Sequence, residues 1–480
     1  MKDRDIAADV LAYFRAISSI PRGSGNEARI CEWIEDFGKT LGFPTIHDRY
    51  NNAVIFKAGQ NGGECASPLI LQAHSDMVCE KRDASGHDFS KDSIGVLEKD
   101  GWIFADGTTL GADNGLGVAF ICMILANESL RHPPIEAVVT AGEEIGMIGM
   151  SAFDASCLRA RRMINLDAEE NGVLIAACAG GARSEMSLPV IRCEPKDGSK
   201  LYSVKLSGFA GGHSGVDIRK GTGNAILSAG QAAAVLLEEE EIELCGISAG
   251  AAVNVIPNRA EFTFYADPAK LGRIESVLDR LRLALVRELP SADGAMIFEM
   301  SGREGDVLPF TRETTENILR CVALLPYGAM SFHENLPGQV SLSSNPGVIK
   351  TDEETVIIQS LTRGDVNSAL ERVVGKLRAL SSLGKGRFHV TSGYDAWEYA
   401  PESPLRRLAL QSYRRRYDAD MAVSSIHGGL ECALMAGKIS GLDMISLGPT
   451  LFGVHTPNER FEVQTAAAFW EYLAGLLAEY

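Results

Sequence analysis

The strongest constraint on the fold is a repeated pattern in which a short apolar run ends directly in acidic or imidazole side chains. Residues 68–73, 135–141 and 163–166 are apolar runs of buried-strand type, and a helical segment at 115–127 lies between the first two. Strands separated by helical segments favour an α/β sheet that is covered on both faces, with ligands beyond the strand ends. We therefore expect an α/β fold with a site at the carboxyl ends of its strands.

The length of the chain and a change of rhythm along it predict more than one domain. The 480 residues are about three times the usual single-domain size. From about residue 201 the predicted order becomes strand, helix, two strands, helix, strand, and a second pass follows. Two consecutive βαββαβ units, which resemble the ferredoxin-like motif, fit this order. After residue 401 the chain again shows helices and an apolar run like those of its first part. We therefore predict a catalytic domain in two parts, 1–183 and 391–480, with an inserted α+β lid domain at 184–390.

The composition argues against several classes of partner. Lys and Arg number 46 against 63 Asp and Glu, and the net charge of −17 repels phosphate backbones and anionic lipid surfaces. The longest apolar stretch, 225–237, is shorter than the ~20 residues of a membrane span, and the N-terminus has no segment of signal-peptide type. The ten cysteines are scattered without a CxxC pair, which suits reduced thiols. We expect a cytoplasmic protein that binds neither nucleic acid nor membranes.

The polar groups that follow the apolar runs point to a metal site. They are 74–76 (HSD), 111–115 (GADNG), 142–144 (GEE) and 165–169 (NLDAE). One such group alone is more often a helix cap or a solvated loop charge. Four of them in one chain favour a shared cation, because acidic side chains buried without a partner are costly. Imidazole and carboxylate ligands without thiolates suit Zn²⁺, or Mn²⁺ and Co²⁺, and the excess of carboxylates favours two ions.

The spacing within two of these groups separates the roles of neighbouring side chains. In an extended HSD segment alternate residues point to the same side, so Asp76 can support and orient His74. In the pair Glu143-Glu144 successive side chains diverge, so one carboxylate can bind metal while the other takes a proton from metal-bound water. His455, which also follows an apolar run, is a candidate for the second imidazole.

Seven segments together resemble the active-site motifs of the dizinc exopeptidase family that contains carnosinases and peptidase T. They are 71–78 (LQAHSDMV), 109–115 (TLGADNG), 143–147 (EEIGM), 165–167 (NLD), 211–215 (GGHSG), 427–432 (HGGLEC) and 448–450 (GPT). Within that family the combination is similar to the aminoacyl-histidine dipeptidases. The motifs follow one another in the same order over nearly the whole chain.

The resemblance implies a dinuclear site with five ligands. Asp113 would bridge two divalent ions, with His74 and Asp167 on one ion and Glu144 and His455 on the other. The ions would be Zn²⁺ by the resemblance, with Co²⁺ or Mn²⁺ as alternatives. The peptide bond that follows the bridging aspartate would be cis.

The same resemblance implies catalytic and substrate-binding residues. Glu143 would be the general base and Asp76 would orient the histidine ligand next to it. His213, in a glycine-rich turn of the inserted domain, resembles the histidine that polarises the scissile carbonyl and stabilises its oxyanion. The substrate-binding positions would be Asn254, Arg363 and Gly429, of which the arginine suits bidentate binding of a carboxylate.

The implied activity is hydrolysis of small dipeptides by a metal-bridged water, and a preference for Xaa-His substrates such as carnosine rests on the resemblance alone. The inserted domain would be a lid. The oligomeric state is open: a doubled insert could let one chain complete its own site, whereas relatives also form homodimers through such domains. An N-acyl amino-acid deacylase of the same chemistry is an open alternative, because the metal cluster does not choose the acyl group. A non-catalytic metal-dependent binding protein is the alternative from another class. The intact Glu143 argues against it, because a binding protein needs the ligands but no free base.

Overall fold

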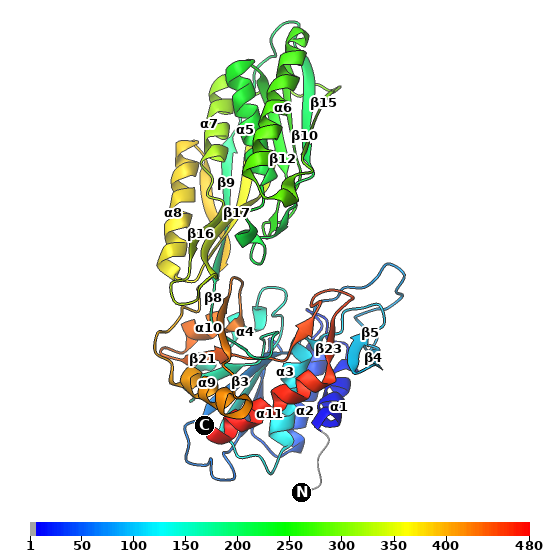
Figure 1. The fold of residues 1–480 in the computed structure, drawn as a ribbon, viewed down its shortest axis with the longest axis vertical. Coiled ribbons are helices and arrows are strands. Elements are labelled where there is room, and N and C mark those ends of the chain that lie inside the picture. The colour runs from blue at the N-terminus through cyan, green and yellow to red at the C-terminus, as the bar shows by residue number, and fades with distance from the viewer. Residues whose placement is uncertain (1–5) are drawn as a thin grey trace. The chain divides into compact units, whose positions relative to one another are not determined.

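The computed structural model describes residues 6–480 and divides the chain into two compact units (Figure 1). The first unit runs to Cys178 and also contains Tyr399–Ile426 and Leu430–Tyr480, and the second contains Ala179–Glu398 and His427–Gly429. Each unit has its own hydrophobic core. The prediction that the N-terminus carries no signal peptide falls partly on residues 1–5, which lie outside the described residues. No helix among the residues from 6 onward is long and apolar enough to cross a membrane.

The first unit is built on an eight-stranded mixed sheet with the order β1-β2-β6-β3-β7-β21-β8-β20. Its central strands β3 (Leu69–His74), β6 (Ile135–Thr140) and β7 (Arg162–Asn165) are parallel. Every residue of β3 and β6 is buried, and since successive side chains point to opposite faces, both faces of the sheet are covered there. The predicted α/β fold is confirmed. The other strands are β1 (Thr45–His47), β2 (Ala53–Lys57), β8 (Val173–Cys178), β20 (Ala422–Ile426) and β21 (Asp443–Ser446).

One helix of the first unit, α3 (Ala112–Ala126), lies in the interior. Its residues are apolar on all sides and buried almost throughout, as expected for a helix enclosed by its own unit. The remaining helices are α1 (Ile6–Ser18), α2 (Ala28–Thr40), α4 (Ile148–Ala152), α9 (Pro404–Tyr417), α10 (Glu431–Lys438) and α11 (Val463–Glu479). A small sheet has the order β22-β23-β5-β4, formed by β4 (Val96–Lys99), β5 (Trp102–Ala105), β22 (Leu451–Phe452) and β23 (Arg460–Glu462).

The second unit contains two βαββαβ arrangements in one nine-stranded sheet. The first has the strand order β15-β10-β14-β12 and the second the order β17-β18-β9-β19. Buried and half-exposed residues alternate along β14, so the core lies on one face of the sheet. The elements are β9 (Gly180–Pro189), β10 (Lys200–Ser207), β11 (Gly212–His213), α5 (Ala225–Glu239), β12 (Glu243–Ala249), β13 (Val255–Ile256), β14 (Ala260–Ala266), α6 (Leu271–Glu288), β15 (Ile297–Gly302), α7 (Arg312–Ala323), β16 (Gly328–Phe332), β17 (Val340–Thr351), β18 (Thr355–Gly364), α8 (Asn367–Leu383) and β19 (Arg387–Tyr394).

The two arrangements are nested, whereas the sequence pattern predicted them as consecutive. Strand β9, the first strand of the second arrangement, precedes the whole first arrangement along the chain. It pairs antiparallel with both β18 and β19. These partners are distant in sequence, and its own sequence, GGARSEMSLP, has no strong apolar run. The local sign of the strand is the weak alternation of Ala182, Ser184, Met186 and Leu188, which are buried, with more exposed polar residues.

A single buried arginine joins two loops at the strand ends of the first unit. Arg22 is 1% exposed, and its guanidinium donates to the backbone oxygens of Ser75 at 3.0 Å and Asp76 at 3.1 Å. It also donates to the backbone oxygen of Gly111, which precedes α3. The loop after β3 and the loop before α3 are thus held by one side chain.

We expect Arg22→Met to destabilise the first unit by about 3–5 kcal/mol, because three buried carbonyl oxygens lose their donor. The free energy of unfolding in urea, followed by a probe in that unit, measures the loss. Arg15→Met is the matched control, because Arg15 makes an exposed ion pair with Glu98 at 3.0 Å and should contribute less than about 1 kcal/mol. Equal losses in the two variants would contradict the role of Arg22.

Candidate metal centre

The five predicted ligands lie at one edge of the first unit's sheet. His74 is the last residue of β3, and Glu144 and Asp167 come shortly after β6 and β7. Because these three strands are parallel, their carboxyl ends meet at the same edge. Asp113 lies in the first turn of α3, and His455 lies in the loop between β22 and β23.

Asp113 presents each of its carboxylate oxygens to a different imidazole. Its Oδ1 lies 3.1 Å from Nε2 of His74, and its Oδ2 lies 3.1 Å from Nε2 of His455. Nε2 of His74 is also 3.2 Å from Oδ1 of Asp167, and Nε2 of His455 is 3.0 Å from Oε1 of Glu144. Two groups of three possible ligands therefore share Asp113, with the ligand atoms of each group within 4.8 Å of one another. One carboxylate is placed to serve two ions.

The charges in this cluster fit a cation. Burial raises the pKa of Asp167 to about 6. It also raises the pKa of Glu143 well above the usual range, and the neighbouring negative charges of Asp167 and Glu144 act in the same direction. The pKa of His455 rises to about 11 through its hydrogen bonds to Asp113 and Glu144. The raised pKa values of Asp167 and Glu143 are the result of crowding acidic groups without a cation, whereas the pKa of Asp113 stays low despite its burial because of its hydrogen bonds to His455 and His74. Nitrogen and oxygen donors suit Zn²⁺, Mn²⁺ or Co²⁺.

Asp76 holds the turn that carries Glu143 and Glu144. Its Oδ1 accepts the backbone N–H of Glu143 at 3.0 Å, and its Oδ2 accepts the backbone N–H of Glu144 at 3.2 Å and the Ser24 hydroxyl at 2.8 Å. Its Oδ1 is also 3.4 Å from Nδ1 of His74, and the role of Asp76 in orienting this histidine stays a prediction. The hydrogen bonds from Asp76 to the backbone of Glu143 and Glu144 were not predicted.

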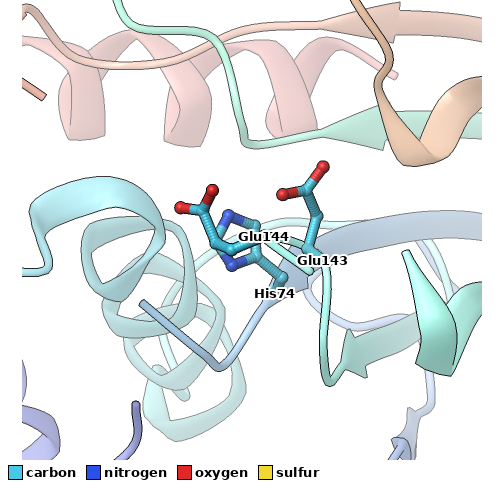
Figure 2. A group of neighbouring side chains, drawn as sticks. All are labelled: His74, Glu143 and Glu144. Atoms are coloured by element: carbon cyan, nitrogen blue, oxygen red, sulfur yellow. The ribbon is translucent and has the colours of Figure 1, made fainter. Parts of the chain in front are cut away.

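Glu143 and Glu144 point to the same side of the loop but their carboxylates diverge, as Figure 2 shows together with His74. Only Glu144 belongs to a group that contains Asp113, whereas Glu143 groups with His74 and Glu144 alone. The prediction that the two side chains point to different sides is therefore not confirmed: one oxygen of each carboxylate and a ring nitrogen of His74 lie within 4.8 Å of one another. Since only Glu144 groups with Asp113, that carboxylate can act as a ligand while the other stays available for proton transfer.

Sequence reasoning missed three polar side chains beside the cluster. Asn114 donates from Nδ2 to Oδ1 of Asp167 at 2.7 Å. Glu431, whose pKa burial raises to about 8, accepts the Thr140 hydroxyl at 2.6 Å. Glu459 accepts four backbone N–H groups, including that of Asp113. Asn114 and Glu431 lie inside the motifs that carried the resemblance, whereas no sequence signal marked Glu459. The peptide bond between Asp113 and Asn114 is cis, as the resemblance implied.

The other candidate residues lie in the second unit. His213 is exposed in the turn at β11, and its Nδ1 accepts the N–H groups of Gly215 and Val216 at 3.3 Å. In the neutral ring the proton is therefore on Nε2, which leaves that atom as a donor. The backbone oxygen of Asn254 accepts the N–H of Ser214 at 2.8 Å, so Asn254 lies next to the same turn.

Arg363 and Gly429 lie against a common tyrosine in the second unit. Arg363 on β18 is 8% exposed, and burial lowers the pKa of its guanidinium while a hydrogen bond to Tyr394 raises it. A Cβ atom on Gly429 would lie 2.7 Å from Oη of the same tyrosine, so a side chain there would require this tyrosine to move. His427, next to this glycine pair, has Nε2 2.7 Å from Oγ of Ser343. No sequence signal marked Tyr394 or Ser343.

Comparisons with known proteins agree over nearly the whole chain. The model of peptidase family M20/M25/M40 matches residues 70–479. The cytosol non-specific dipeptidase of Escherichia coli (strain K12) is 32% identical over 466 residues, which cover 97% of this chain and 96% of that protein. The crystal structure of aminoacylhistidine dipeptidase from Vibrio alginolyticus matches with a TM-score of 0.90 and 30% identity, covering 99% and 98% of the two chains. The aminopeptidase PepT structure from Bacillus cereus, at 17% identity and a TM-score of 0.56 over 98% of both chains, shares the fold.

We expect substitutions at Glu143 and Glu144 to have different effects. Glu143→Ala should keep the metal content and lose ~10²–10⁴ in the rate of peptide hydrolysis, because a positioned proton acceptor is removed. Glu144→Ala should lower the metal content as well, because a ligand is removed. Metal analysis of the two purified variants beside the unsubstituted protein makes the measurement. Loss of metal in Glu143→Ala with full occupancy in Glu144→Ala would reverse the assignment.

Proposed function

The chain belongs to peptidase family M20/M25/M40, and we propose that within this family it is a metal-dependent dipeptidase. The single observation that carries the proposal is the placement of Asp113 between two groups of possible ligands, with Glu143 next to them. Two relatives that match almost the full length of the chain are dipeptidases by name, which supports the same activity here. A cytoplasmic location and a homodimer stay predictions.

Two divalent cations, most simply Zn²⁺, would be held by the five clustered side chains. One ion would take His74 and Asp167, the other Glu144 and His455, and both would share Asp113. Such ions act as Lewis acids and lower the pKa of a water molecule towards neutrality. Asp76 keeps the Glu143-Glu144 turn in place through its two backbone hydrogen bonds.

The protein's own groups would handle the proton and the substrate. Glu143 takes a proton from the attacking water and returns it to the leaving amine. His213, with its proton on Nε2, donates to the oxygen that becomes negative in the transition state. Arg363 pairs with the substrate carboxylate in the bidentate manner that guanidinium allows, and Asn254 and Gly429 complete the substrate positions. The assignment of the second unit as a lid stays a prediction.

The substrates belong to the class of small peptides. The two relatives differ in the side-chain preference that their names give. One relative is named for aminoacylhistidine substrates and the other as non-specific. We propose dipeptides as the class, with Xaa-His dipeptides among the substrates.

The direct test is metal analysis combined with hydrolysis of a substrate panel before and after chelation. The panel contains an Xaa-His dipeptide, dipeptides without histidine, a tripeptide and N-acetyl amino acids. We expect about two divalent ions per chain, loss of dipeptide hydrolysis on chelation and recovery with Zn²⁺. Hydrolysis of N-acetyl amino acids alone would identify a deacylase, and metal binding without any hydrolysis would identify a binding protein. Full activity with one ion would overturn the bridging role of Asp113.

We expect His213→Ala to lower the turnover of a dipeptide by roughly 10²–10³, the usual loss for one oxyanion donor, with unchanged metal content. His389→Ala is the matched control, because His389 is another exposed histidine of the second unit, 3.7 Å from Glu185 on the paired strand. The control should retain full turnover. Equal turnover in both variants would remove His213 from the mechanism.

A further inference from the structure

Four consecutive backbone N–H groups converge on the carboxylate of Glu459. Its Oε2 accepts from Leu110 at 2.7 Å and from Gly111 at 2.9 Å. Its Oε1 accepts from Ala112 at 2.7 Å and from Asp113 at 3.2 Å. Glu459 is only 3% exposed, so these hydrogen bonds are shielded from water. One side chain therefore holds the whole backbone segment that leads into Asp113.

This carboxylate takes the place of a local helix cap. The first N–H groups of a helix have no partner within the helix, and a Ser, Thr, Asp or Asn at the preceding position usually accepts one of them. At α3 that position is Gly111, with φ of 69°, so there is no side chain to do this. A Cβ atom there would lie 2.5 Å from Nη2 of Arg22 and 2.7 Å from Sδ of Met77. The packing excludes a local cap, and the acceptor has to come from elsewhere in the chain.

Glu459 belongs to the loop that also carries His455. Its own N–H donates to the backbone oxygen of Thr456 at 3.0 Å, which closes a tight turn just after the histidine. Asp113 and His455 are distant in sequence, and Oδ2 of the one lies 3.1 Å from Nε2 of the other. The four hydrogen bonds of Glu459 thus connect the loops of both side chains close to the point where they meet.

A second buried side chain holds the same segment from the opposite end of a peptide group. Arg22 donates to the backbone oxygen of Gly111, while Glu459 accepts the N–H of Ala112, the other end of the same peptide group. The charged side chains act on adjacent groups of one short segment, and charge-assisted hydrogen bonds of this kind are the stronger ones. The backbone before Asp113 has little freedom to move.

We propose that Glu459 is a positioning residue of the dinuclear site, which sets the carboxylate of Asp113 relative to His455 so that Asp113 can bind both ions. The proposal rests on the proposed function for the two ions that Asp113 would bind and for the effect on catalysis. Groups that orient metal ligands from outside the ligand set typically contribute 10–100-fold in metal affinity or activity. A helix cap without this role would stabilise the unit and leave the metals unaffected.

The test converts the carboxylate into an amide, so that an NH₂ group replaces one of its two oxygens. Glu459→Gln keeps the size of the side chain, but its NH₂ group cannot accept the two N–H groups that face it. We expect binding of Co²⁺, measured by competition with a chelator, to weaken by about 10–100-fold. We also expect a changed visible absorption spectrum of the bound Co²⁺, because the geometry around the ion changes. For dipeptide hydrolysis, kcat should fall while KM changes little.

Glu136→Gln is the matched control. Glu136 on β6 is 5% exposed and accepts the backbone N–H groups of Arg159 at 2.9 Å and Ala160 at 3.1 Å. It lies near the amino end of β6, away from the edge that carries the ligands. This variant should lose thermal stability and keep the Co²⁺ affinity and spectrum of the unsubstituted protein. Equal weakening of Co²⁺ binding in both variants would reduce Glu459 to a structural cap and overturn the proposal.

A second variant keeps the test valid if Glu459→Gln does not fold. Glu459→Asp retains the charge but is one methylene shorter, so it cannot reach all four N–H groups, and we expect weaker Co²⁺ binding with a shifted spectrum. Co²⁺ affinity and spectrum equal to those of the unsubstituted protein in either folded variant would overturn the proposal. The proposed function fails separately, if the unsubstituted protein binds Co²⁺ as expected but hydrolyses no dipeptide.

Discussion

The structure of the first unit depends on how it accommodates several carboxylates in a buried position. Asp113, Asp167 and Glu144 lie close to only two imidazoles, and burial pushes the pKa of Asp167 up to about 6. Such crowding is costly without a compensating charge. A pair of divalent cations removes the cost and uses the carboxylates at the same time. The hydrogen bonds around the cluster then hold groups that would otherwise repel one another.

The parallel strands explain why these side chains meet. Their carboxyl ends share one edge of the sheet, and each loop that leaves this edge carries a polar side chain. The loops themselves are held by buried charged groups. Asp76 holds the turn of Glu143 and Glu144, and Arg22 and Glu459 hold the backbone before Asp113. These three supports are fully buried, whereas the ligand candidate His455 is half exposed.

The two units contribute different chemistry. The clustered carboxylates and imidazoles belong to the first unit, while the proposed oxyanion donor His213 and the proposed carboxylate partner Arg363 belong to the second. Metal content and turnover are therefore expected to be separable properties: loss of a ligand such as Glu144 should lower both, whereas substitution of Glu143 or His213 should lower turnover alone. A deacylase of the same chemistry would share the first set of residues, so the clustered ligands by themselves do not set a preference for dipeptides.

The sequence alone determined the residue types at the site, because an apolar run that ends in His74, Asp167 or the pair Glu143-Glu144 is a local pattern. It also indicated two ferredoxin-like arrangements, because their helices and most of their strands have local periodicity. It did not reveal strand β9, which lacks an apolar run and pairs with strands far along the chain. It did not reveal Glu459 either, because a carboxylate that caps a distant helix looks like any loop glutamate. Only the tertiary structure decides such partners, since they depend on which loops the sheet brings together.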